Sequence, residues 1–186
     1  MNKVGEFYKV SFKQFKKDIK PIVDPHDTGE IEDIARELYD NILYPTRATK
    51  GSAGYDFKTP FNFTLAPGES IKIPTGIRVR MKEGWMLACF PRSGLGFKYR
   101  VQLDNTVGII DSDYFYSDNE GHIFAKLTND SRNDKTVSLK VGDAFMQGIF
   151  IPFGTTINDA ATGIRNGGLG STSIPNVIEF AQKQAA

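Results

Sequence analysis

The sequence predicts an all-β fold, a jelly-roll-like β-barrel, preceded by an N-terminal helical extension. Between residues 44 and 151 apolar and polar side chains alternate, as along Ile77–Lys82, and this period of two is typical of half-buried strands. Turn signals such as Pro67-Gly68 separate the alternating runs at short intervals, which favours a sandwich or a barrel. Before residue 44 the apolar residues instead recur at helical spacing.

The first helix of the extension is predicted to begin at Ser11. Ser11 and Gln14 have the spacing of a capping box, and Phe12, Phe15 and Ile19 share one face behind it. We interpret the opposite face as a solvated surface rather than a nucleic-acid patch, because the charges of the whole chain balance. That face carries four lysines: Lys13, Lys16, Lys17 and Lys20.

The second helix is predicted from Glu30 to about Leu43. Asp27 or Thr28 is the expected N-cap, since both side chains can accept a hydrogen bond from the first turn. Its apolar stripe indicates packing against the core or another subunit rather than a ligand groove. The stripe consists of Ile31, Ile34, Ala35, Leu38 and Ile42.

Strands follow in the barrel region. Ile77–Lys82 and Val137–Val141 alternate and are predicted to be half buried, whereas Trp85–Phe90 and Ala144–Ile151 are predicted to be more deeply buried strands. After them, a stretch rich in Gly, Ser, Thr and Asn has no apolar period and predicts a loop or tail. The expected organisation is a helical extension packed on the barrel (1–44), the barrel (45–159) and a flexible C-terminal arm (160–186).

Composition excludes several classes of function. The 186 residues suit one domain that needs no disulfide to hold its core. The chain has 23 Lys and Arg residues and 22 Asp and Glu residues, which gives a net charge of +1. This balance excludes a protein that binds nucleic acid or another polyanion through a large positive charge. One cysteine, Cys89, and two histidines exclude an internal disulfide and a Cys2His2 zinc site. Without a membrane-spanning run or a signal peptide, we expect a cytoplasmic protein that binds neither membranes nor nucleic acid directly.

Four short segments could carry chemistry. Arg165–Thr172 contains glycines, hydroxyls and an arginine that could form an anion-binding nest, although a flexible tail explains the same residues. Gly108–Tyr114 places a carboxylate and an aromatic ring after an apolar strand. These residues could be a general base beside a ring that stacks on a sugar, or they could simply form a β-turn. Pro91–Gly96 and Ala53–Asp56 offer an arginine, a serine and an acid at strand ends, where structural roles are also expected.

Taken in order, and together with Gly142–Asp143 and Gln147, these four segments resemble the five motifs of the homotrimeric deoxyuridine triphosphatase (dUTPase) family. The resemblance covers about residues 44–173, and the order and intervals of the matches make it specific. The five matching segments are Thr46–Asp56, Pro91–Leu95, Asn105–Tyr114 resuming at Gly121, Gly142–Asp143 with Gln147, and Arg165–Thr172.

The resemblance implies a jelly-roll-like, dUTPase-like barrel that forms a homotrimer. Each active site of the family draws on three chains: motifs one, two and four from one, three from another and five from the third. The implied reaction is the Mg²⁺-dependent hydrolysis of dUTP to dUMP and pyrophosphate, which limits uracil incorporation into DNA and supplies dUMP for thymidylate synthesis.

The resemblance also implies roles for individual residues. Asp111 matches the general base that activates the water attacking the α-phosphorus, and Tyr114 matches the ring packed on the deoxyribose. Asn105, with neighbouring hairpin backbone, matches the group that hydrogen-bonds uracil, and Asp56 matches the acid that contacts Mg²⁺ through water. Arg92, Ser93 and Gln147 match triphosphate contacts. The other implied substrate-binding residues are Gly94, Gly108, Ile110, Arg165, Gly168, Leu169, Gly170, Ser171 and Thr172.

The sequence departs from the family pattern in four places. Leu169 stands where many members have a phenylalanine that stacks on uracil. Ala144 replaces a usual arginine, residues 115–120 are inserted in the third motif, and residues 1–44 exceed the minimal first strand. Alternative rings for stacking on uracil are Phe97, Phe115 and Tyr116.

Two other functions are compatible with parts of this pattern. dCTP deaminases share the fold and the triphosphate site, but their third motif differs from Gly108–Tyr114. The chain could also be a regulatory module in which closure of the arm on a nucleotide controls binding of a protein partner, through residues 1–44 or 115–120.

Overall fold

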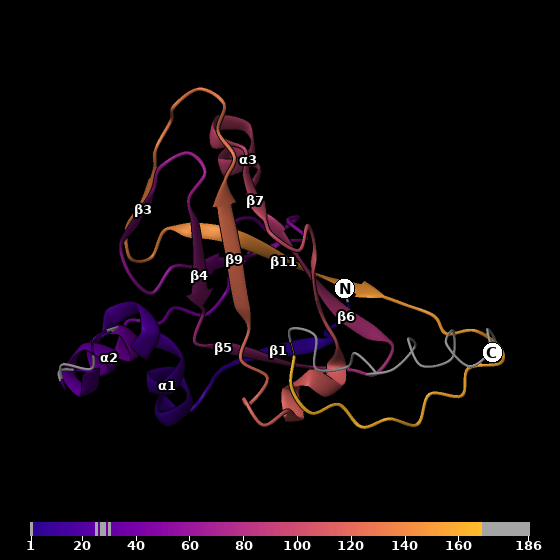
Figure 1. Ribbon diagram of the computed structural model, residues 1–186. Coiled ribbons are helices and arrows are strands. Elements are labelled where there is room, and N and C mark those ends of the chain that lie inside the picture. Colours follow the sequence, from indigo (N-terminus) through magenta and orange to yellow (C-terminus); the bar gives the residue numbers. More distant parts are fainter. Residues whose placement is uncertain (1, 25, 27–28, 30, 169–186) are drawn as a thin grey trace, which may run out of the picture.

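The computed structural model describes residues 2–24, 26, 29 and 31–168 (Figure 1). Three helices and a short 3-10 segment accompany the strands in this part of the chain. In chain order the elements are β1 (Gly5–Lys9), α1 (Phe12–Val23), α2 (Ile31–Asp40), β2 (Tyr55–Lys58), β3 (Phe63–Leu65), β4 (Ser70–Pro74), β5 (Ile77–Met81), β6 (Trp85–Pro91), α3 (Ser93–Tyr99), β7 (Val101–Leu103), β8 (Gly108–Ile110), η1 (Ser112–Tyr116), β9 (Phe124–Asn129), β10 (Val137–Leu139) and β11 (Ala144–Pro152).

The strands form antiparallel sheets whose neighbours are mostly distant in sequence. One sheet has the order β2-β11-β6-β8 and a second has the order β4-β9-β7. Two further pairs, β1-β5 and β3-β10, complete the described sheets. The result is the predicted all-β, jelly-roll-like fold, in which non-local pairing brings the ends of several strands together.

The strands predicted from alternation form where expected. In β5 Ile77, Val79 and Met81 are buried while Arg78 and Arg80 point outward. The two apolar runs become β6 and β11, which pair along their length from Met146 opposite Pro91 to Pro152 opposite Trp85. A register shift between Ala144 and Met146 bends the start of β11 where it also pairs with β2.

The core is a single cluster shared by the barrel and the N-terminal helices. Phe15 and Ile19 of α1 are fully buried, as is Ala35 of α2. They pack in one cluster with barrel side chains that include Phe57, Ile73, Leu87 and Phe145. Burying a large apolar side chain contributes about 1.5–3 kcal/mol, so the two helices add materially to the stability of the barrel.

The N-terminal segment is not only helical. Residues 5–9 form β1, which pairs antiparallel with β5 and places Phe7 opposite Val79. This strand is not predicted from the sequence, because five residues are too few to establish a period. Its partner lies about seventy residues further along the chain, a pairing that local patterns cannot reveal.

The start of α1 is predicted correctly, but only half of the capping box forms. Ser11 is the N-cap, and its Oγ accepts the Gln14 N–H at 3.1 Å. The Gln14 side chain does not return to Ser11: it donates to Asp18 Oδ2 at 2.7 Å. The Ser11 N–H donates instead to the Glu120 carboxylate, from a distant turn, at 2.7 Å.

The second helix is shorter than predicted. α2 ends at Asp40 rather than near Leu43, because the chain turns there and directs Ile42 into the core. Its predicted start at Glu30 and the candidate caps Asp27 and Thr28 lie outside the described residues.

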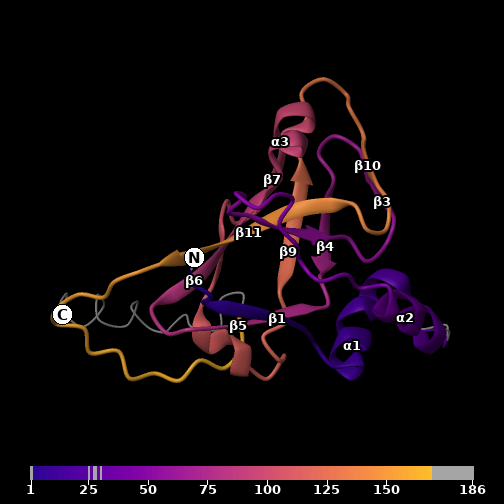
Figure 2. The ribbon, with the colours of Figure 1, turned by 180° about the vertical axis from the view of Figure 1, so that it is seen from behind.

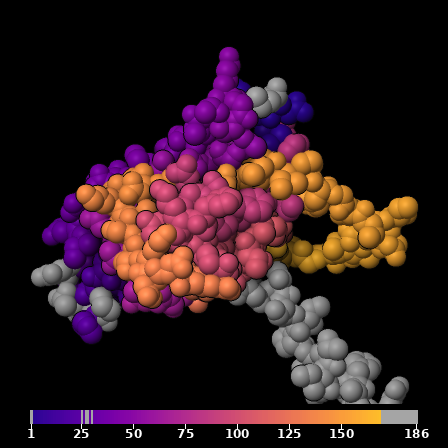
Figure 3. Space-filling view, turned by 90° about the horizontal axis from the view of Figure 1, so that it is seen from above, coloured from indigo at the N-terminus to yellow at the C-terminus, as the bar shows by residue number. Residues whose placement is uncertain are grey.

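The helices and the C-terminal segment occupy opposite ends of the molecule. Figures 1 and 2 place α1 and α2 at one end, and the chain after β11 extends from the other and returns toward η1. From above, this segment projects beyond the body of the protein (Figure 3). Among the described residues, no helix has the length and apolar character needed to cross a membrane.

Candidate active site

A cavity of about 530 Å³ opens beside the edge strand β8 and the segment η1. β8 is held by β6, with Gly108 opposite Cys89 and Ile110 opposite Leu87. Seven of the predicted site residues line this cavity, from the β8 hairpin, from η1 and from the returning arm: Asn105, Gly108, Ile110, Asp111, Tyr114, Arg165 and Gly168.

Asp111 stands at the junction between β8 and η1. Its backbone oxygen accepts the Tyr114 N–H at 3.2 Å, so the first turn of η1 fixes the residue at the cavity. Its carboxylate is partly exposed and forms an ion pair with Arg165. The same guanidinium donates through Nε to Asp113 at 2.9 Å. The arm therefore lies against the carboxylate that the sequence predicts to be the general base.

The ring of Tyr114 lines the cavity, and its hydroxyl is hydrogen-bonded to protein groups. The hydroxyl donates to the His122 backbone oxygen at 2.8 Å and accepts from Asn119 Nδ2 at 2.7 Å. Burial raises the pKa of Tyr114, and the hydrogen bond from Asn119 partly offsets this effect. Gly168 of the arm lies against the ring: a Cβ there would come within 2.8 Å of the ring atom Cε2. Only glycine allows the arm to approach the ring this closely.

The hairpin before β8 carries Asn105. Thr106 follows with a left-handed φ of 61°, and the Val107 N–H donates to the Asn105 backbone oxygen at 2.7 Å. Gly108 keeps the hairpin close to β6, since a Cβ there would lie 3.2 Å from the Cβ of Cys89. The geometry leaves backbone groups and one amide side chain along the cavity wall, as recognition of a planar base requires.

A second cluster gathers Asp56, Arg92 and Gln147 from three adjacent strands or strand ends. Gln147 of β11 lies between Asp56 of β2 and Phe90 of β6 in the sheet register. Arg92 Nε lies 3.3 Å from Asp56 Oδ1, and Gln147 Nε2 donates to the Pro91 oxygen at 3.3 Å. The first, second and fourth motifs thus meet in one place.

Ser93 and Gly94 begin α3 directly after this cluster. With Arg92 they line a separate cavity of about 480 Å³ that extends toward β10. Asp143 and Ala144 also line this cavity. The Asp143 carboxylate accepts the Lys140 N–H at 2.8 Å and so stabilises the turn before β11.

The two clusters lie along the same strand, β6. Ile110 pairs with Leu87, and Arg92 follows Leu87 by five residues toward the far end of β6. At about 3.4 Å per residue, the Arg92 backbone is about 17 Å along the strand from Ile110. Gly108, in the same cavity, lies opposite Cys89, and Met146, which also lines that cavity, lies opposite Pro91 and precedes Gln147.

Sequence reasoning missed several side chains of the first cavity. Lys72 of β4 and Phe124 of β9 line it, with the Lys72 ammonium 4.5 Å from the Phe124 ring centre. Lys126 also lines it and lies 2.7 Å from Asp104; hydrogen bonds from Lys126 and Thr128 lower the pKa of Asp104. Local patterns give no signal for this group, because the pairing of β4 with β9 brings it together.

None of the alternative rings lines this cavity. Phe97 is 92% exposed on α3 and Tyr116 is 75% exposed. Phe115 packs beneath the Arg78 guanidinium at 3.6 Å, away from the cavity. The aromatic side chains that do line it are Tyr114 and Phe124. Leu169, Gly170, Ser171 and Thr172 lie outside the described residues.

Comparison with known proteins agrees with this arrangement. Residues 40–173 match the family model described as dUTPase. The chain belongs to the dUTPase family. Its enzyme class is therefore dUTP diphosphatase, and the jelly-roll-like fold is the one that dUTPases share.

Individual dUTPases show how far the similarity extends. The deoxyuridine 5'-triphosphate nucleotidohydrolase of Lactococcus lactis is 40% identical over 134 residues, which are 70% of this chain and 88% of that protein. The crystal structure of dUTPase from Streptococcus mutans is 40% identical and covers 63% of this chain and 90% of its own, with a TM-score of 0.55. A mutant dUTPase of S. aureus phage phi11, reported for coordination of a structural Mg(II) ion, shares the fold at 23% identity, with a TM-score of 0.55 and coverage of 69% and 95%.

Proposed function

We propose that this dUTPase hydrolyses dUTP to dUMP and pyrophosphate with Asp111 as the general base. The observation that carries the proposal is the convergence of Asp111, Tyr114 and Asn105 on one cavity. A carboxylate, an aromatic ring and an amide within one wall supply a proton acceptor, a sugar platform and a base-recognition group.

The chemical step requires a water molecule beside Asp111. The carboxylate accepts a proton from this water while the water oxygen forms a bond to the α-phosphorus. The bond between the α-phosphorus and the bridging oxygen breaks, and pyrophosphate leaves. Asp111 then returns the proton to solvent. General base catalysis of this kind contributes roughly 10²–10⁴-fold to a rate.

Selection of the substrate depends on the β8 hairpin and on η1. Asn105, with the backbone at Gly108 and Ile110, pairs with the uracil edge and leaves polar groups unsatisfied when cytosine is bound. Tyr114 packs against the deoxyribose and leaves no space for a 2′-hydroxyl. Its hydroxyl is already engaged by two hydrogen bonds, so the ring is held in one orientation.

The triphosphate is held by Arg92, Ser93, Gly94 and Gln147. Asp56 would hold Mg²⁺ through water. The residues fit an ion held mainly by the phosphates, because Asp56 supplies a hard carboxylate oxygen beside Arg92, where the triphosphate is proposed to lie. Mg²⁺ retains several waters and binds phosphates readily, and it would neutralise charge on the triphosphate.

The C-terminal arm closes the site. Arg165 clamps the phosphates, and the glycines and hydroxyls that follow it complete the closure: Gly168, Leu169, Gly170, Ser171 and Thr172. Closure excludes bulk water and aligns the reacting groups. We also propose that the chain has three parts: an N-terminal helical extension (1–44), the barrel (45–159) and the C-terminal arm (160–186).

The proposal includes a homotrimer with shared active sites, which membership of the dUTPase family supports. As the resemblance to the family implies, each site would take motifs one, two and four from one chain, motif three from another and motif five from the third. Light scattering of the active protein should give three times the 20.7 kDa of one chain. A stable and active monomer would overturn the shared site.

The function is tested by incubating the protein with dUTP and, separately, with dCTP, UTP and dTTP. We expect pyrophosphate and dUMP from dUTP, and loss of the reaction when EDTA removes Mg²⁺. Release of ammonia from dCTP would instead assign the site to deamination. Equal hydrolysis of all four nucleotides would contradict the roles of Asn105 and Tyr114.

A further inference from the structure

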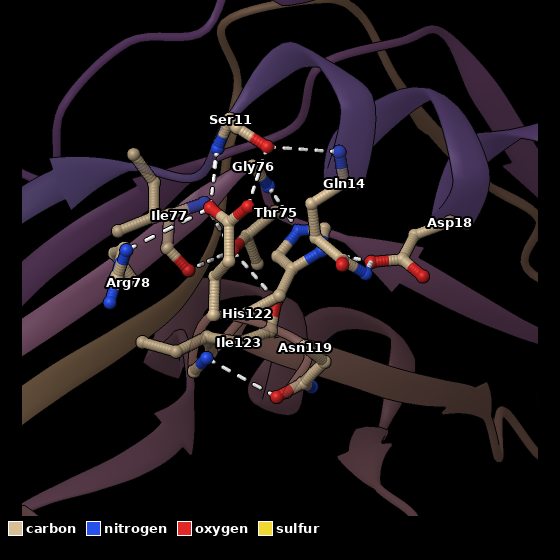
Figure 4. Close-up of polar contacts among 12 residues, drawn as sticks. Ser11, Gln14, Asp18, Thr75, Gly76, Ile77, Arg78, Asn119, His122 and Ile123 are labelled. Carbon is tan, nitrogen blue, oxygen red and sulfur yellow. Dashed lines mark hydrogen bonds and ion pairs between the residues drawn. The ribbon is translucent and has the colours of Figure 1, made fainter. Parts of the chain in front are cut away.

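The N-terminal extension contacts the turn after η1 through one buried histidine. His122 is fully buried, and its two ring nitrogens have different partners (Figure 4). Nε2 accepts the Gly76 N–H at 2.8 Å, while Nδ1 lies 2.6 Å from Asp18 Oδ2 in α1. Since Nε2 is an acceptor, Nδ1 carries the hydrogen and donates it to Asp18. The orientation of the ring is therefore set by α1 on one side and by the start of β5 on the other.

The carboxylate that receives this hydrogen bond is itself held in place. Gln14, one turn earlier in α1, donates to Asp18 Oδ2 at 2.7 Å. Phe15 and Phe124 pack around the His122 ring, with ring centres 6.3 Å and 4.6 Å away. Both hydrogen-bonding partners and both ring contacts favour one position of His122.

A second contact joins the start of α1 to the same turn. The Ser11 N–H and Oγ donate to the two carboxylate oxygens of Glu120, at 2.7 Å and 2.5 Å. Glu120 has a left-handed φ of 58°, which is costly for a residue with a side chain. Burial raises the pKa of Glu120, but the hydrogen bonds from Ser11 outweigh it and leave the pKa below its usual range. Ser11 thus stabilises the charged form of Glu120 in a strained turn.

This turn supplies both hydrogen bonds to the Tyr114 hydroxyl. The His122 backbone oxygen accepts its hydrogen at 2.8 Å, and Asn119 donates to it at 2.7 Å. Gly121, between them, has a φ of 66° and lies against the Tyr114 backbone oxygen. The position of the Tyr114 ring in the cavity consequently depends on a turn that is hydrogen-bonded to α1 through Ser11 and Asp18.

We propose that Asp18 and His122 are positioning residues for Tyr114, and that the N-terminal extension thereby sets the discrimination between dUTP and UTP. The inference rests on the proposed function, in which Tyr114 packs against the deoxyribose. Exclusion of one hydroxyl requires the ring to be placed to within a fraction of an ångström, and a misplacement of about 1 Å can cost about 10²-fold. A turn held only by its own backbone would allow such a shift.

The experiment compares Asp18→Ala with Asp18→Asn and Glu32→Ala. Asp18→Ala removes the acceptor of the His122 hydrogen bond, whereas the amide oxygen of Asp18→Asn can still accept it. Glu32 belongs to the same extension and pairs with Lys16, but it does not contact the turn. For each variant, kcat/KM is measured with dUTP and with UTP, together with the melting temperature.

Asp18→Ala should lower the ratio of the two kcat/KM values by at least about tenfold. Asp18→Asn should restore the ratio to within about threefold, and Glu32→Ala should leave it unchanged. If Asp18→Ala does not fold, Ser11→Ala replaces it and should lower the ratio in the same direction. An unchanged ratio in a folded variant, or an equal fall in Glu32→Ala, would overturn the inference. Absence of dUTP hydrolysis by the wild type would instead overturn the proposed function.

Discussion

Arg165 Nη2 lies 2.5 Å from Asp111 Oδ2, so an arginine of the C-terminal arm pairs with the proposed general base of its own chain. The contact engages one of the two carboxylate oxygens of Asp111, and the other oxygen can still accept hydrogen bonds. In the proposed function Arg165 clamps the triphosphate, so we expect this arginine to exchange the Asp111 carboxylate for a phosphate when the substrate binds.

Removing the arm should abolish catalysis without unfolding the protein. A chain ending at Ile164 loses Arg165 and the rest of the fifth motif, and we expect hydrolysis of dUTP to fall by about 10²-fold or more. The described residues that this truncation removes, Arg165, Asn166, Gly167 and Gly168, contribute no apolar side chain to the core. The melting temperature should stay within a few degrees of wild type.

The matched control is a chain ending at Ser173, which retains the whole motif and should keep its activity. Full activity of the shorter chain would show that the arm has no catalytic role. A large fall in its melting temperature would mean that the arm belongs to the structural core.

Asp111→Asn should lower kcat by about 10²–10⁴-fold with little change in KM, because the amide occupies the same space but cannot accept the proton. Asp113→Asn is the control, since Asp113 pairs with the same arginine without a proposed part in the chemistry. Steady-state kinetics with dUTP distinguish the two. If both variants lose activity equally, the contact with Arg165 rather than base catalysis explains the loss.

Gly121→Ala should destabilise the protein more than Gly68→Ala. Both glycines have a positive φ, 66° and 83°, which costs an alanine about 1–2 kcal/mol. Around Gly68 there is open space, whereas a Cβ at Gly121 would lie 2.6 Å from the Tyr114 backbone oxygen. Forcing that contact adds about 1–3 kcal/mol, which denaturant unfolding of the two variants can measure. Equal losses would show that the turn can relax.

Cys89 should resist alkylation in the folded protein. Burial raises the pKa of its thiol from 9.0 to about 12, so at pH 8 only about 10⁻⁴ of it is thiolate. Iodoacetamide should therefore label Cys89 only after unfolding. Rapid labelling of the native protein at pH 8 would contradict the burial of this thiol.

The same thiol makes stability depend on alkaline pH. Above about pH 9 the unfolded chain releases the thiol proton while the native chain keeps it, so the free energy of unfolding falls as pH rises. A Cys89→Ala variant should lack this contribution between pH 9 and 11. Identical pH profiles for the two proteins would contradict it.

Local patterns predict much of this fold. The alternation at Ile77–Lys82 and the apolar runs that become β6 and β11 need no information from elsewhere in the chain, since each strand shows its own buried face. Ser11 is likewise a local signal, because its hydroxyl caps a helix that begins with the next residue.

Features made by distant residues could not be predicted in this way. The sequence analysis assigned no role to His122 and expected Gln14 to complete a capping box. In the structure Gln14 holds Asp18, and Asp18 holds His122, across about a hundred residues of sequence. Phe124 and Lys72 meet in the cavity only because β4 pairs with β9. Periodicity describes one strand at a time and cannot specify such pairs.

The pairing of β1 with β5 has a consequence for the behaviour of shortened chains. β1 occupies the hydrogen-bonding edge of β5, from Gly5 opposite Met81 to Lys9 opposite Ile77. Deleting residues 1–9 would leave that edge bare, with its N–H and C=O groups free to recruit strands from other molecules. Such a chain would lose solubility through edge-to-edge aggregation while its catalytic motifs remained intact, so β1 protects the protein against self-association.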